Sequence, residues 1–168
     1  PCGVSIKKNH LESYKSAVAC DPVSAFGGIV SCNFKINKHL ALELSKLFLE
    51  VIVANNFDIN ALKILKRKKN LRILDISKFG EKNVSKIKTF DGSFIIQNKD
   101  EIILDKKKLK CVTKLKPSKK DLNEIKFAFN VCKYVKSNAI VLSNNFSTIG
   151  IGGGQPSRLD SCKIAIQK

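Results

Sequence analysis

The sequence predicts an α/β fold, a layered sheet with flanking helices, and three observations support this prediction. Helix-like and strand-like segments alternate at short intervals over the first 75 residues, which is typical of layered α/β domains. The run Val-Ile-Val-Ala at 51–54 is continuously apolar, as strands of a buried parallel sheet are. Near the end of the chain, an apolar strand passes through a group of glycines into a helical pattern.

The first half contains three predicted helices and three predicted strands. The helices lie at residues 11–20, 37–48 and 58–67, and the strands at residues 24–33, 51–54 and 71–74. The helix over 37–48 is indicated by one apolar face made by Leu40, Leu44, Leu47 and Phe48. The segment 24–33 contains Phe-Gly-Gly at 26–28, which predicts a tight turn into a buried strand.

Residues 75–120 are lysine-rich and irregular, with possible strands at 93–98, 101–104 and 110–115. We expect a hairpin or meander inserted at an edge of the sheet. No internal repeat or linker divides the chain, so the sequence predicts one domain or part of one.

The remaining residues predict two helices around a pair of strands. Ser118 and Asp121 form a possible capping box for a helix over 119–135. Its predicted apolar face consists of Leu122, Ile125, Phe129 and Cys132. Strands at 138–143 and 146–152 follow, with a tight turn expected at Asn144-Asn145. The last helix is expected to begin near Pro156.

The composition favours a globular cytoplasmic protein without a membrane segment. The chain has 168 residues, 43% of them hydrophobic, and no apolar run approaches the roughly 18 residues that span a bilayer. The N-terminus, PCGVSIKKNH, lacks the apolar core of a signal peptide. Because the sequence contains no methionine and ends inside a helical pattern, we expect a domain truncated at both ends.

Six cysteines are spread along the chain without a C-x-x-C pair, and the two histidines, His10 and His39, lie near no cysteine pair. This spacing predicts free thiols that are mostly buried, and it predicts no metal site.

The net charge of +17 raises the possibility of nucleic-acid binding. Only three of the 31 cationic residues are arginines, however, and the lysines are scattered in short runs such as KRKK at 66–69. Arginine is the side chain that reads bases and grips phosphates. We therefore expect no nucleic-acid partner, and the positive charge can attract anionic small molecules. A basic nucleic-acid-binding module and a non-catalytic fragment remain the alternatives.

The strongest local motif is IGIGGGQPSRLDS at 149–161, in which a glycine-rich loop precedes a helix. The free N–H groups of a helix start can bind an anion or a polarised carbonyl. A P-loop requires Lys-Ser or Lys-Thr after the last glycine, where this chain has Gln155-Pro156. A glycine-rich turn can be purely structural, but Arg158 in the first helical turn favours a ligand oxygen.

Three further positions are candidates for ligand contacts. Asn138 opens a strand and could offer an amide donor and acceptor, or could cap the preceding helix. Gly27 follows Phe26, whose ring could stack on a flat ligand or pack in the core. Glu50 precedes an apolar strand and could bind an amine or hydroxyl, or simply face water.

Taken in order, PCGV, CDPVSAFGGIV, FLEVIVA, VKSNAIV and IGIGGGQPSRLDS resemble the transformylase domain of the family in which AICAR formyltransferase is fused to IMP cyclohydrolase. The resemblance covers residues 1–168. It implies a partial transformylase domain, mostly the first of two cytidine-deaminase-like units, without the cyclohydrolase domain. A zinc deaminase of that fold group would need H-x-E and P-C-x-x-C, and neither string is present.

The resemblance implies formyl transfer from 10-formyltetrahydrofolate, a co-substrate, to the 5-amino group of AICAR, without a metal. The product FAICAR would be closed to IMP by the other domain, and the whole protein would be a homodimer. The family's catalytic Lys-His pair would lie just upstream of Pro1, so the isolated chain is expected to be inactive. Similarity places Gly27, Glu50, Asn138 and Arg158 around AICAR, with Asn138 and Arg158 supporting catalysis, and Leu159 beside the folate.

Overall fold

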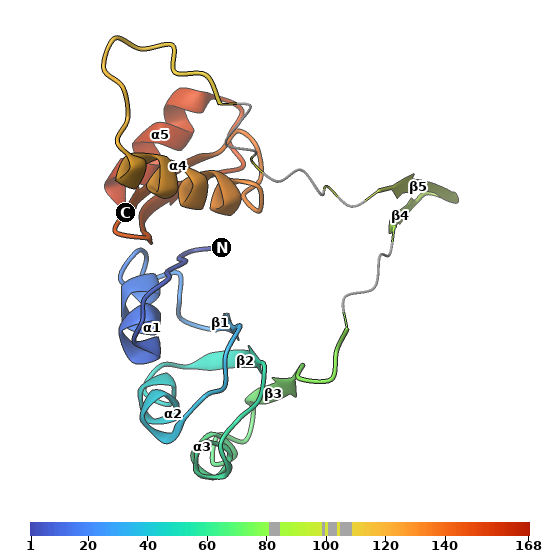
Figure 1. The fold of residues 1–168 in the computed structure, drawn as a ribbon. Helices are drawn as coiled ribbons and strands as arrows, with labels where there is room; N and C mark the ends of the chain where they lie inside the picture. Colours follow the sequence, from blue (N-terminus) through green and yellow to red (C-terminus); the bar gives the residue numbers. More distant parts are fainter. Residues whose placement is uncertain (81–84, 99, 101–103, 105–108) are drawn as a thin grey trace.

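The computed structural model describes residues 1–80, 85–98, 100, 104 and 109–168. Mixed helices and strands are arranged in two main groups, shown in the lower and upper parts of Figure 1. The first group consists of α1 (His10–Val18), β1 (Gly28–Cys32), α2 (Lys38–Leu44), β2 (Leu49–Ala54), α3 (Ile59–Leu65) and β3 (Arg72–Asp75). The fold class is therefore α/β, as the sequence predicts.

Strands β1, β2 and β3 form a parallel three-stranded sheet in that order, with β2 in the centre. The main core consists of buried apolar side chains from β2, α2, α3 and the segments beside them. Its fully buried members include Ile36, Leu40, Leu44, Ile52 and Leu65. Burying one such side chain contributes roughly 1.5–3 kcal/mol, so the apolar run at 51–54 and the helical face of α2 together stabilise this sheet.

Several predicted boundaries change in this half. Helix α2 ends at Leu44 instead of continuing to Phe48, because the chain turns at Ser45 and Lys46 to enter β2. The strand that follows the Phe-Gly-Gly turn is not buried as expected. It is the edge strand β1, and Ile29 on it is 69% exposed.

Strands β4 (Lys86–Phe90) and β5 (Ser93–Gln97) form an antiparallel hairpin. The predicted strand at 93–98 is thus confirmed, but the hairpin is a separate two-stranded sheet and not an addition to the edge of the main sheet. It extends away from the rest of the chain in Figure 1. The prediction of a strand at 110–115 is wrong, since these residues form bends and irregular backbone. The strand predicted at 101–104 lies largely outside the described residues.

The second group contains α4 (Lys119–Cys132), β6 (Ile140–Asn144), β7 (Ser147–Gly152) and α5 (Arg158–Gln167). Strands β6 and β7 pair antiparallel. The capping box at the start of α4 is confirmed: Asp121 N–H donates to Ser118 Oγ at 3.2 Å, and Ser118 N–H donates to the Asp121 carboxylate at 2.8 Å.

The buried face of α4 differs from the predicted one. Phe127 and Val131 are buried, whereas Ile125 and Phe129, on the predicted face, are exposed. Two apolar stripes run along this helix, and the one that contains Phe127 packs against the β6–β7 hairpin, where its ring meets that of Phe146 edge-on at 6.1 Å.

The turn between β6 and β7 is also displaced by one residue, to Asn145 and Phe146, both with positive φ. Two positive φ values are what a two-residue hairpin turn requires, and they cost energy in a phenylalanine. Tertiary contacts compensate for this cost: Phe146 N–H donates to the Glu124 carboxylate at 3.0 Å, and its ring packs on α4.

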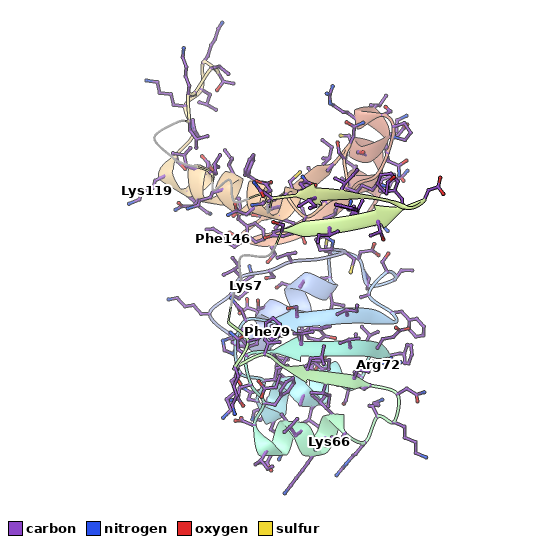
Figure 2. The ribbon with its side chains drawn as sticks, turned by 90° about the vertical axis from the view of Figure 1, so that its right-hand side faces the viewer. Lys7, Lys66, Arg72, Phe79, Lys119 and Phe146 are labelled. Carbon is purple, nitrogen blue, oxygen red and sulfur yellow. The ribbon has the colours of Figure 1, made fainter. Side chains whose placement is uncertain are left out.

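The N-terminal segment joins the two groups. Ser5 forms an antiparallel bridge with Ser147 at the start of β7, and Val4 and Thr148 exchange backbone and side-chain hydrogen bonds. Figure 2 shows Lys7 and Phe146 near this junction, where the Lys7 ammonium donates to the carbonyl of Asn145. The residues that open the chain thus lie beside β7, which leads into the glycine loop.

All six cysteines are free thiols, but fewer are buried than expected. Cys20 and Cys32 are buried, Cys132 and Cys162 are half-buried, and Cys2 and Cys111 are exposed. Within the described residues, no helix has the length and apolar character needed to cross a membrane.

Candidate functional site

The glycine loop connects β7 to α5, and the backbones of this strand and this helix are packed closely against each other at the glycines of β7. A Cβ atom at Gly150 would lie 1.8 Å from the carbonyl oxygen of Ala165, and one at Gly152 would lie 1.9 Å from that of Ser161. Only residues without a side chain allow the strand and helix backbones to approach so closely. The helix start is capped by Ser157, whose Oγ accepts from the N–H of Leu159 at 3.1 Å.

Asn138 fastens this loop to the residues that precede β6. Its side-chain amide donates to the carbonyl oxygens of Gln155 at 3.0 Å and Pro156 at 2.8 Å, and its backbone N–H donates to Gln155 O at 3.1 Å. The side-chain donors are therefore engaged within the chain. Oδ1 accepts no hydrogen bond from the described residues, so it is the group that Asn138 can offer to a ligand.

Ser161 completes the connection from the side of the helix. It is fully buried, and its Oγ donates to the carbonyl of Asn138 at 2.8 Å. The same hydroxyl lies 3.4 Å from the carbonyl of Ser157, the capping residue. Asn138, the loop carbonyls, Ser157 and Ser161 thus form one connected hydrogen-bond network around the start of α5.

Arg158 is the first residue of α5 and is exposed. It forms no ion pair with any carboxylate in the described parts of the chain, and the nearby Asp160 is 3.9 Å from Lys163 instead. A guanidinium at the positive end of a helix gains nothing from the helix dipole. Arg158 is therefore held in place without an internal partner and can donate two parallel hydrogen bonds to an external oxygen. Leu159, beside it, is 62% exposed.

The other two predicted site residues lie together at the start of β1 and β2. Gly27 has φ of +70° and donates its N–H to the carbonyl of Phe48 at 2.9 Å. The rings of Phe26 and Phe48 lie 5.3 Å apart, and both are partly open to solvent. Glu50 is exposed in β2, two residues after Phe48. This group offers an aromatic surface and a carboxylate.

The structure thus brings the predicted residues together in two pairs, Gly27 with Glu50 and Asn138 with Arg158. No hydrogen bond or ion pair among the described residues joins one pair to the other. Sequence reasoning did not identify Ser161 or the carbonyls of Gln155 and Pro156 as parts of the site. The sequence offered one signal for Ser161: it is a small hydroxyl residue about one helical turn after Arg158, as expected of a side chain that faces a strand containing glycines.

A cavity of about 270 Å³ lies beside the glycine loop, with Pro1, Cys2, Lys136, Gly153 and Asp21 among its lining residues. Lys168 also reaches it and pairs with Asp21 at 2.5 Å. Burial alone raises the pKa of Asp21, but the bonds from Lys168 and Ser24 outweigh this effect and lower it to about 2. The Asp21 carboxylate is thus ionised and neutralised by Lys168 at neutral pH.

Metal-binding groups are not assembled in the part of the chain that the structure describes, where no three His, Cys, Asp or Glu side chains come together. The chemical groups gathered at the glycine loop are hydrogen-bond donors and an amide oxygen, which suit a polar organic ligand with an acceptor oxygen.

Comparison with known proteins defines the class to which this fold and loop belong. The family model described as the AICARFT/IMPCHase bienzyme matches residues 1–168, so the chain belongs to this family. The chain is similar to the bifunctional purine biosynthesis protein PurH of Thermoanaerobacter sp. (strain X514), with 46% identity over 168 residues. PurH of Rhizobium rhizogenes is 44% identical over 170 residues, and PurH of Aquifex aeolicus is 42% identical over 168.

Each of these matches covers 100% of this chain but only 32–33% of the relative. The chain therefore spans about a third of the length of the curated relatives that it matches.

Proposed function

We propose that, in the complete protein, this chain forms part of the site where a formyl group passes from 10-formyltetrahydrofolate to the 5-amino group of AICAR. The product would be FAICAR, which the protein's second activity would close to IMP. The observation that carries the proposal is the position of Arg158: it is fixed at the start of α5 by the glycine loop and the Asn138 network, and it has no internal ion-pair partner in the described residues.

The reaction defines what the site must provide. The amine nitrogen attacks the formyl carbon and forms a C–N bond, while the carbonyl electrons move to the oxygen as an oxyanion. A base removes the proton from the nitrogen, and the bond from carbon to the folate nitrogen then breaks as that nitrogen is protonated. The transition state therefore requires donors aimed at the oxyanion and a base near the amine.

Arg158 and Asn138 suit different parts of this requirement. The planar fork of Arg158 can donate to the carboxamide oxygen or to the developing oxyanion. Asn138 has committed its donors to the loop, so its role toward a ligand is narrower than the sequence suggested: Oδ1 can accept from the carboxamide N–H₂. At the start of β1 and β2, Phe26 offers a surface for a flat ring, and Glu50 can accept from a hydroxyl.

The catalytic base would come from outside this chain. The family resemblance implies a Lys-His pair immediately before Pro1, and Pro1 shares a cavity with Lys136 and Gly153. A pair at that place would lie beside Gly153 of the glycine loop, which leads to Arg158. The isolated chain would then lack formyl transfer, while the complete, cytoplasmic and homodimeric protein would have it.

The proposal is tested by incubating the complete protein with AICAR and 10-formyltetrahydrofolate and following AICAR-dependent release of tetrahydrofolate. Release with formation of FAICAR supports the proposal, and its absence in a folded protein would refute it. Binding to duplex DNA or RNA, measured against salt concentration, examines the alternative. A steep salt dependence that AICAR does not affect would favour a nucleic-acid-binding module instead.

A further inference from the structure

We propose that Ser161 is a positioning residue for formyl transfer, which aligns Asn138 and Arg158 although it touches neither substrate. The inference rests on the proposed function and extends it to a residue inside the protein. It is carried by hydrogen bonds that run from α5 to Asn138 and from Asn138 to the glycine loop, whose backbone then leads back into α5.

The first link is the bond from Ser161 Oγ to the carbonyl of Asn138, at 2.8 Å, across 23 residues of sequence. Ser161 is 0% exposed, so its hydroxyl donates this bond from a position that solvent does not reach. Removing the hydroxyl takes away the only described donor to this carbonyl from α5, and the loss of such a bond costs stability. The hydroxyl therefore determines where the backbone of Asn138 lies relative to the helix.

The second link runs from Asn138 to the loop. Its backbone and side-chain N–H groups both donate to Gln155 O, and the side chain also donates to Pro156 O, two residues before Arg158. These bonds fix the direction in which the loop enters the helix. The third link is the backbone bond from Ser161 N–H to Ser157 O, at 3.2 Å, which returns the network to α5.

The space around Ser161 limits what can replace it. Gly152 approaches its backbone so closely that a Cβ there would lie 1.9 Å from Ser161 O. A larger side chain at 161 would have to be accommodated within a fully buried contact, at a cost of typically 1–3 kcal/mol. Alanine fits the space but removes the donor, and cysteine keeps a weak donor at nearly the same size.

Because Ser161 would act through orientation, its loss should affect the rate of the chemical step more than substrate binding. A small misplacement of reacting groups can reduce a rate by up to about 100-fold. We expect Ser161→Ala in the complete protein to lower kcat for formyl transfer roughly tenfold, with KM for AICAR changed less than about threefold. Ser161→Cys should recover part of kcat, and cyclohydrolase activity should stay at the wild-type level in both variants.

Ser13→Ala serves as the matched control. Ser13 is also a buried helical serine whose Oγ donates to a carbonyl, that of Ser5 at 2.9 Å, but it forms no hydrogen bond with Asn138 or with residues 153–158. Both alanine variants should lower the melting temperature by a similar amount. Only Ser161→Ala should reduce formyl transfer by more than about twofold.

Amide hydrogen exchange of the complete protein measures the order of the glycine loop independently of the rate of formyl transfer. Peptides that cover residues 153–160 should exchange faster in Ser161→Ala than in the wild type, and Ser13→Ala should leave them unchanged. Unaltered exchange in these peptides, or faster exchange with undiminished kcat, would overturn the inference. Absence of formyl transfer in the wild type would instead refute the proposed function, and the exchange rates would then decide by themselves whether Ser161 orders the loop.

Discussion

The side-chain amide of Asn138 donates a 2.8 Å hydrogen bond to the carbonyl of Pro156, two residues before Arg158. This bond links the entry of β6 to the start of α5. It makes the orientation of the exposed arginine depend on a residue 20 positions earlier in the chain. Asn138 thus has a structural role, whether or not its Oδ1 also contacts a ligand.

Replacing Asn138 with aspartate would test that role without changing the size of the side chain. Aspartate has no donor and would direct negative charge at the carbonyl oxygens of Gln155 and Pro156. We expect Asn138→Asp to lower the melting temperature and to reduce formyl transfer at least roughly tenfold, since two loop carbonyls lose their donor and face a negative charge instead. Thermal unfolding and formyl-transfer assays of the complete protein measure the two effects. A wild-type melting temperature together with a wild-type rate of formyl transfer would show that the bonds from Asn138 to the loop carbonyls contribute to neither stability nor activity.

The close approach of β7 and α5 predicts the effect of adding a side chain to Gly152. A Cβ there would lie within 3.0 Å of three backbone atoms, which cannot move away independently of the helix. Gly152→Ala should therefore reduce the free energy of unfolding by about 2–3 kcal/mol, as overpacking in a core does. Gly80→Ala is the control, because a Cβ at Gly80 meets nothing within 4 Å. Urea denaturation should show no loss of stability for Gly80→Ala, and equal stability of the two variants would contradict this account of the packing.

The ion pair between Asp21 and Lys168 predicts a specific loss of stability in acid. The folded protein lowers the pKa of Asp21 to about 2, whereas an unfolded chain has a value near the ordinary 3.8. A lowered carboxyl pKa contributes stability that is complete above the unfolded value and is lost as the pH falls through the folded one. The stability difference between the wild type and Asp21→Asn should thus be constant above about pH 5 and shrink between pH 4 and pH 2. A difference that does not vary with pH over this range would show that the pair is not formed.

The environments of the cysteines predict different reactivities toward iodoacetamide. Burial raises the pKa of the Cys32 thiol to about 11, whereas hydrogen bonding with Thr113 lowers the pKa of the exposed Cys111. Since the thiolate is the reactive form, Cys111 should be modified fastest at pH 7. Cys32 should react at least about 1,000-fold more slowly, because it requires unfolding of the native state. Peptide mass spectrometry against time measures both rates, and comparable rates would contradict the described burial.

Much of the fold could be predicted where local sequence patterns agree with tertiary packing. The strand over 51–54, the helix after Ser118 and the helix near Pro156 lie close to their expected positions, because apolar periodicity and capping residues act locally. The turn at Asn145 and Phe146 could not be placed in the same way. Its position depends on Glu124 and Phe127 of α4, which are distant in sequence.

The candidate site also contains features that local sequence determines and features that depend on contacts between residues distant in sequence. The glycine loop and the first-turn position of Arg158 follow from adjacent residues, so the sequence alone was sufficient to predict them. The engagement of Asn138 by two loop carbonyls, and the buried hydroxyl of Ser161 behind it, arise from contacts across 17 to 23 residues. Such contacts have no local signature. The family resemblance implies which residues would surround a ligand, but it does not indicate which of them hold the loop together.

The most direct test of the proposed function is the effect of Arg158→Ala on the two activities of the complete protein. We expect formyl transfer to fall about 100-fold or more, as when one donor to a developing oxyanion is lost, while conversion of FAICAR to IMP is unchanged. Arg67→Ala, which removes an exposed arginine just after α3, should leave both activities at wild-type levels. Undiminished formyl transfer in Arg158→Ala would show that this arginine does not serve the reaction and would contradict its assignment to the site.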